Sequence, residues 1–268
     1  MKRLLSFTLC LVLLFSFGAT AYAASTTYTD TIQAILDNYD ANNDSCDTAL
    51  QQQVNGAYRL VELLSVIAVQ KAGKSGYKDI ALEVLDSLGE TDDACDTVKQ
   101  QLANGVYRSA EMLYIIATEM DKSGRYNDLI SETYDRYKSS EKSAENVEHQ
   151  IVNGLYRCVE FLSIIASENA STSSHTDLIS DILDDYSNGD DGADSVLQQQ
   201  VNGAYRMAEC LMLIALELDS PGTYTDLIGD ILDSYTSNDK SAANANQQLV
   251  NGLYRSVELA AIIAYELA

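Results

Sequence analysis

Proline is almost absent from this 268-residue chain, since Pro221 is the only one. Proline lacks a backbone N–H and clashes with the preceding turn inside a helix, so its absence elsewhere leaves room for long uninterrupted helices. The alternation of apolar and polar residues that is typical of half-buried strands is also missing. Together these absences predict an all-α fold.

Residues that commonly carry catalysis or bind metal ions are scarce and scattered. His149 and His175 are the only histidines, and neither recurs in the repeated units described below. The sequence contains no Cys-x-x-Cys, His-Glu-x-x-His or Gly-x-Ser-x-Gly motif and no glycine-rich phosphate loop. Acid–base and nucleophilic catalysis need such groups held close together. We therefore predict a non-enzymatic protein with no catalytic residue, no metal site and no cofactor.

Basic residues are few, with 17 Lys and Arg against 40 Asp and Glu, and the formal net charge is −23. Nucleic acids and anionic lipid surfaces repel a chain of this sign, so both are excluded as partners. The acidic balance favours solubility and basic partners.

The first 23 residues have the pattern of a secretory signal peptide. Lys2 and Arg3 precede an uncharged apolar stretch over residues 4–17, and Ala21-Tyr22-Ala23 supplies the small residues of a cleavage site. The apolar stretch is shorter than the ~20 residues of a membrane-spanning helix. We expect cleavage after Ala23, which removes two basic residues and leaves a net charge of −25. A secreted or periplasmic protein with no membrane insertion after cleavage is predicted.

The rest of the chain is a tandem repeat. The string Asn-Gly-x-Tyr-Arg begins at five positions spaced by 49 residues, which are Asn55, Asn104, Asn153, Asn202 and Asn251. Residues 24–268 have five times this length. The five copies are therefore approximately 24–72, 73–121, 122–170, 171–219 and 220–268, and they form a single repeat domain.

Each copy is predicted to be a helical hairpin. In the first copy, apolar residues at helical spacing indicate a short helix over residues 28–39 and a long helix over about 45–70. The prediction is an α-solenoid of five 49-residue helical hairpins. The last helix is as apolar as an inner one, so two alternatives remain: a closed α/α toroid, or ends that meet between molecules. The open array is preferred.

Four side chains of the long helix are the same in all five copies and are the candidate ligand-binding residues. Asn, Arg and Glu share one polar face of the helix, and Tyr lies nearby. In five stacked copies these side chains would line a concave surface that holds a protein or an extended polymer. The structural alternative is an Arg–Glu ion pair within each helix and a ladder of Asn and Gln between helices. These rows comprise Asn55, Tyr58, Arg59, Glu62, Asn104, Tyr107, Arg108, Glu111, Asn153, Tyr156, Arg157, Glu160, Asn202, Tyr205, Arg206, Glu209, Asn251, Tyr254, Arg255 and Glu258.

The long helix also carries an unchanging glycine, Gly56 in the first copy. Glycine inside a helix costs roughly 1 kcal/mol relative to alanine, so five of them predict the close approach of a neighbouring helix or of the Tyr58 ring. Apolar residues on more than one side of the long helix predict that it is an inner helix.

Other candidate sites are weaker. Asp40, Asn42 and Asp44 begin like a calcium-binding loop, but the expected glycine and closing glutamate are absent, which favours a solvated loop. Cys46, Cys95, Cys158 and Cys210 allow three disulfide pairings, and Cys158 and Cys210 are expected to be small buried apolar residues.

Three function hypotheses follow. The first is a secreted or periplasmic binding or scaffold protein that uses the rows. The second is a surface or envelope protein that associates with itself through its ends. The third is a carbohydrate-active toroid, which needs a pair of carboxylates facing a central cavity.

Overall fold

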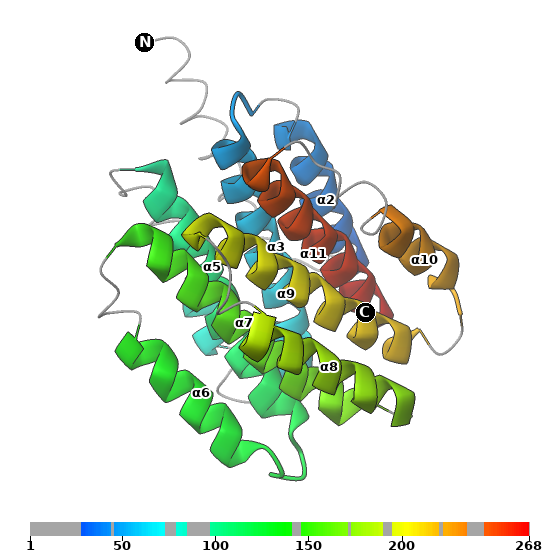
Figure 1. Ribbon diagram of the computed structural model, residues 1–268. Helices are drawn as coiled ribbons and strands as arrows, with labels where there is room; N and C mark the ends of the chain where they lie inside the picture. Colours follow the sequence, from blue (N-terminus) through cyan, green and yellow to red (C-terminus); the bar gives the residue numbers. More distant parts are fainter. Residues whose placement is uncertain are drawn as a thin grey trace.

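The computed structural model describes residues 28–43, 46–72, 79–84, 97–140, 146–170, 173–189, 195–219, 222–234 and 244–267. All regular structure within these ranges is helical, which confirms the all-α prediction (Figure 1). None of the described helices is long and apolar enough to cross a membrane. The predicted signal peptide, residues 1–23, lies outside the described residues.

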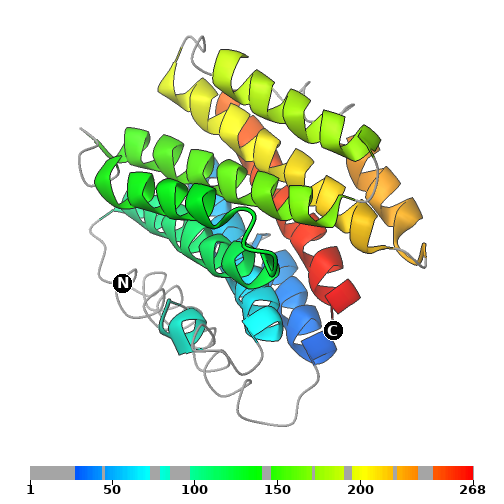
Figure 2. The ribbon, with the colours of Figure 1, turned by 90° about the horizontal axis from the view of Figure 1, so that it is seen from below.

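Five long helices form the centre of the molecule. They are α3 (Ala49–Ala72), α5 (Val98–Met120), α7 (Val147–Asn169), α9 (Val196–Leu218) and α11 (Ala245–Leu267). Each packs against the next, in the order α3, α5, α7, α9 and α11, and α11 then packs against α3 (Figures 1 and 2). The five long helices therefore form a closed ring.

The contact between α11 and α3 corrects the preference for an open array. At this seam the side-chain amide of Gln53 donates a hydrogen bond to the carbonyl oxygen of Asn246, at 3.0 Å. The hydroxyl of Tyr265 in α11 donates to Oε1 of Gln33 in the first short helix, also at 3.0 Å. Closure buries the apolar faces of the first and last helices, which an open array would expose to water. The arrangement matches the predicted alternative, a closed ring of hairpins.

Short helices cover the outside of the ring. They are α2 (Tyr28–Asn43), α6 (Asn127–Ser140), α8 (Ser173–Gly189) and α10 (Thr225–Ser234), and residues 79–84 are also helical. Each labelled short helix contacts two neighbouring long helices, as α6 contacts α5 and α7. Their buried stripes include the equivalent isoleucines Ile32, Ile130, Ile179 and Ile228. The prediction that the long helix is an inner helix is therefore confirmed.

The long helices start about four residues later than expected. The equivalent residues Thr97, Asn146 and Ser195 are N-caps, and each side-chain oxygen accepts a hydrogen bond from the backbone N–H three residues later. Such caps satisfy N–H groups that have no partner within the helix. The predicted start at residue 45 is therefore wrong, because α3 begins at Ala49. The recurring Thr, Asn or Ser is the signal in the sequence that marks the true start.

The loop predicted over residues 40–44 also needs correction, because α2 continues to Asn43. Asp40 and Asn42 are therefore helical residues and do not belong to a calcium-loop geometry. Within the described ranges, no three His, Cys, Asp or Glu side chains come close enough to hold a metal ion.

Candidate functional site

The recurring arginine and glutamate of every copy form an ion pair within one helix. The Nη1–Oε2 distance is 2.7 Å for Arg59 and Glu62. The equivalent pairs of α5, α9 and α11 have distances of 2.8, 2.8 and 2.6 Å, and Arg157 pairs with Glu160 in the same way. The predicted pairing at i and i+3 is confirmed in all five copies.

These ion pairs differ in how deeply they are buried. The side chains of Arg59 and Glu62 are 4% and 14% exposed, whereas those of Arg255 and Glu258 are 22% and 39% exposed. Burial raises the pKa of Glu62, and the positive charge of Arg59 opposes that rise. Of the five ion pairs, that of the first copy is the most deeply buried.

The asparagines of the rows accept hydrogen bonds from glutamines one turn earlier in the same helix. The distances are 3.2 Å for Gln100 to Asn104, 3.1 Å for Gln198 to Asn202 and 3.3 Å for Gln247 to Asn251. Asn55 is buried, and Asn153 is half-buried. These bonds hold the three asparagine side chains within their own helices, whereas the structural alternative predicted Asn and Gln bonds between helices, so that part of it is wrong for these three asparagines.

Two of the hydrogen bonds between long helices come from a glutamine position outside the predicted rows. Gln53 reaches the carbonyl of Asn246, and Gln200 reaches the carbonyl of Glu148 at 2.9 Å. The position is glutamine in only two copies, while the others hold Leu102, Ile151 and Leu249. Because the residue type changes from copy to copy, the repetition itself does not reveal this position.

Each recurring tyrosine packs on the recurring glycine of a neighbouring helix. A Cβ atom added to Gly105 would lie 2.9 Å from Cδ1 of Tyr58, and one added to Gly56 would lie 3.4 Å from Cδ1 of Tyr254. The predicted close approach is confirmed, and it recurs at every seam of the ring. The same contact joins the other three seams, between Tyr107 and Gly154, Tyr156 and Gly203, and Tyr205 and Gly252.

The rows thus lie in the wall of the ring. Their arginines and glutamates pair within a helix, and their tyrosines fill the seams. These contacts favour the structural alternative for the rows, and their use as a ligand surface stays a prediction.

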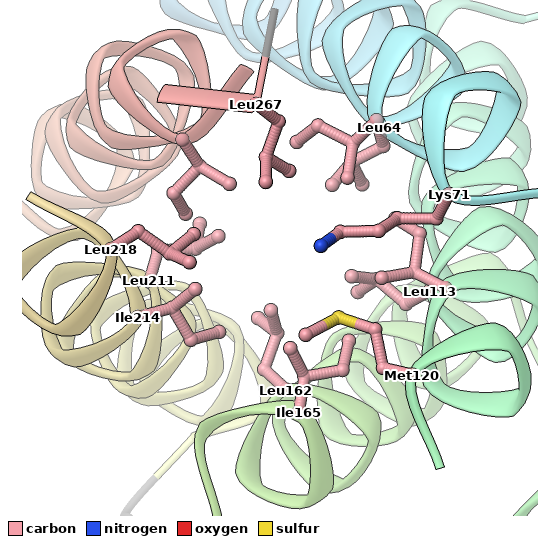
Figure 3. Close-up of a pocket in the computed structure, with 13 residues that line it drawn as sticks. Leu64, Lys71, Leu113, Met120, Leu162, Ile165, Leu211, Ile214, Leu218 and Leu267 are labelled. Carbon is pink, nitrogen blue, oxygen red and sulfur yellow. The ribbon is translucent and has the colours of Figure 1, made fainter. Parts of the chain in front are cut away.

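A separate pocket lies on the ring axis, near the C-terminal ends of the long helices (Figure 3). Helix α3 contributes Leu64, Ile67 and Lys71, and the other four helices contribute leucine, isoleucine and methionine side chains at equivalent positions. The side chains converge from all five long helices around an apolar hollow that is open to solvent. Lys71, Met120 and Leu218, near the helix ends, are partly exposed.

The lining of the axial pocket is apolar except for Lys71. None of the lining residues is a carboxylate, so this pocket does not supply the carboxylate pair that a carbohydrate-active toroid requires. The Nζ of Lys71 points into the space between the apolar side chains (Figure 3). Burial lowers the pKa of Lys71, and the nearby charge of Lys122 lowers it further.

No disulfide joins the cysteines that the structure describes, which are Cys46, Cys158 and Cys210. Cys158 and Cys210 are fully buried, as expected for small apolar residues, and burial raises the pKa of the Cys210 thiol. Cys46 is partly exposed, while Cys95 lies outside the described residues.

Comparison with known protein families, curated proteins and solved structures finds no match for this chain. The assignment of function therefore depends on the sequence and on the geometry of the ring.

Proposed function

We propose that this chain is an exported, non-enzymatic binding protein whose ligand site is the axial pocket. The proposal depends on one observation, the convergence of apolar side chains from five helices on the ring axis (Figure 3). Pockets lined mainly by apolar side chains with a few polar groups are the usual form of small-molecule sites. Export is supported by the signal-peptide pattern of residues 1–23.

The pocket is a better candidate than the rows. A protein or an extended polymer bound along the rows would have to reach arginines and tyrosines that are buried or half-buried between helices. The outer end of the pocket is partly exposed at Lys71, Met120 and Leu218, so a small apolar molecule can approach it from solution.

The proposal is tested by measuring how a substitution that fills the pocket changes the binding of an apolar probe. Decanol serves as a neutral apolar probe, and its binding is measured by titration calorimetry. Leu218→Trp places a larger ring at the outer end of the pocket and is expected to weaken decanol binding at least about tenfold.

The matched control is Leu227→Trp, because Leu227 is 49% exposed on the outer helix α10. This variant is expected to bind decanol like the unmodified protein. Absence of decanol binding to the unmodified protein, or equal binding by both variants, would remove the pocket as the ligand site.

Self-association is the second candidate function, and one observation favours it. Ile80, Leu129, Leu178 and Leu227 occupy equivalent positions on four outer segments, and each is 43–49% exposed. Because α11 packs against α3, the first and last long helices cover each other and leave no exposed end for association. Association would then use the exposed apolar side chains of the outer segments. A molar mass that rises with concentration in light scattering supports association, and a constant monomer mass counts against it.

A further inference from the structure

We infer that the axial pocket binds an aliphatic carboxylate, with the alkyl chain among the leucines and isoleucines and the carboxylate on Nζ of Lys71. This inference depends on the proposed function, because it names the class of ligand that the same pocket takes.

Lys71 is a cation in an apolar pocket. It comes from the last turn of α3, it is half-buried, and its Nζ points toward the other lining side chains (Figure 3). Among the described residues, no carboxylate forms an ion pair with it. A partly desolvated ammonium gains free energy from an anionic partner, and a ligand that enters the pocket can supply one.

The first copy departs from the other four at this point. The positions equivalent to Lys71 hold Met120, Asn169, Leu218 and Leu267, none of which carries a charge. The differences at residues 70 and 71 make this sector of the ring more positive than the other four, although the chain as a whole is strongly acidic. The preceding residue is Gln70 in the first copy, whereas the other copies have Glu119, Glu168, Glu217 and Glu266.

A second cation lies close to this sector. Lys122 follows the end of α5 and is exposed, and its charge acts on Lys71. Two neighbouring ammonium groups repel each other, and an anion between them or beside them relieves that repulsion. Lys71 and Lys122 therefore make the sector of the first copy the positive part of an otherwise acidic end of the ring, and an anionic headgroup is complementary to that sector.

The apolar lining indicates the chemistry of the part of the ligand that lies beyond the headgroup. Twelve of the thirteen lining residues are leucine, isoleucine or methionine, so they offer no hydrogen bond to a sugar, a nucleotide or a peptide backbone. A flexible alkyl chain matches these side chains and is stabilised by about 0.8 kcal/mol for each buried methylene. An alkyl chain with one terminal carboxylate matches the chemistry of both parts of the pocket.

The test compares three probes that share a ten-carbon chain: decanoate, decanol and decyltrimethylammonium. Titration calorimetry with the purified protein is expected to show the tightest binding for decanoate, weaker binding for decanol and the weakest for the cation. Lys71→Met, which copies the residue of the second repeat, is expected to weaken decanoate binding about tenfold and to leave decanol binding unchanged.

Lys99→Met is the matched control, because it removes the same charge at the opposite end of the ring. Lys99 is exposed and pairs with Glu148 at 2.6 Å, so its loss is expected to leave the binding of all three probes unchanged. Equal weakening by both lysine variants would show that overall charge, and not Lys71, controls binding, and would overturn the inference.

The outcomes separate this inference from the proposed function. If decanol and decanoate bind equally to the unmodified protein, the headgroup site is overturned while the apolar pocket stands. If no probe binds, both are overturned. If Lys71→Met fails to fold, the order of the three probes on the unmodified protein still decides the question.

Discussion

Arg59→Ala is expected to lower the free energy of unfolding by about 3 kcal/mol, because it leaves the buried carboxylate of Glu62 without its ion-pair partner. Chemical denaturation followed by circular dichroism measures the change. The same substitution at Arg255 removes a pair whose glutamate is 39% exposed, so the expected loss is about 1 kcal/mol or less. Equal losses in the two variants would contradict the difference in burial.

The pH dependence of Arg59→Ala provides a further check. Burial already raises the pKa of Glu62, and removing Arg59 takes away the charge that opposes this rise. A carboxyl whose folded pKa is raised contributes stability below its unfolded pKa of about 4.3 and loses that contribution as the pH rises through the folded pKa. The deficit of the variant is therefore expected to be smaller at pH ~4 than at pH ~7.

Gly154→Ala is expected to destabilise the protein by about 2 kcal/mol. The added Cβ would lie 2.7 Å from Cγ1 of Val106 and 2.9 Å from Cδ1 of Tyr107, which is closer than carbon atoms approach without displacement. Val106 is buried and branched at Cβ, so its methyl group has little room to move. The clash outweighs the gain of about 1 kcal/mol from replacing glycine by alanine in a helix.

Gly229→Ala is the control for Gly154→Ala. Gly229 lies in α10, and nothing is within 4 Å of the position that its Cβ would take. Alanine there is expected to stabilise the protein by about 0.5–1 kcal/mol through helix propensity alone. A similar gain for Gly154→Ala in thermal unfolding would show that the tyrosine–glycine contact is not tight.

The sequence was sufficient to predict the local features of the ring. Identical residues at 49-residue steps located the long helices, and the unchanging Gly56 and Tyr58 predicted a close contact between neighbours. The spacing of Arg59 and Glu62 predicted their ion pair. These features depend on residues within one helix or between adjacent copies, where the helical period fixes which side chains meet.

Ring closure could not be predicted in the same way. Whether the fifth helix meets the first depends on the small rotation between successive hairpins, added up over five seams. That rotation is set by side-chain packing such as Tyr107 against Gly154, which the sequence does not express as an angle. Apolar residues at the end of the chain fitted both a closed ring and a contact between molecules.

The axial pocket could not be predicted from the sequence either, for a different reason. Leu64 and Ile67 have the same periodicity as core residues, and only their convergence with equivalent side chains on the axis leaves a space between them. The sequence does contain a signal, which is the change to Gln70 and Lys71 in the first copy. In a repeat of this kind, departures from the common pattern are therefore as informative about a site as the unchanging residues.

Zero-length crosslinking shows whether α11 packs against α3 in the same way as each of the other long helices packs against the next. Lys99 and Glu148 occupy equivalent positions on α5 and α7, with Nζ and Oε1 2.6 Å apart, and carbodiimide treatment should join them. Asn246→Lys with Leu50→Glu places the same pair at the same positions of α11 and α3. Peptide mapping of the monomer is expected to find both crosslinks within one molecule. The native crosslink without the introduced one would contradict the closed ring.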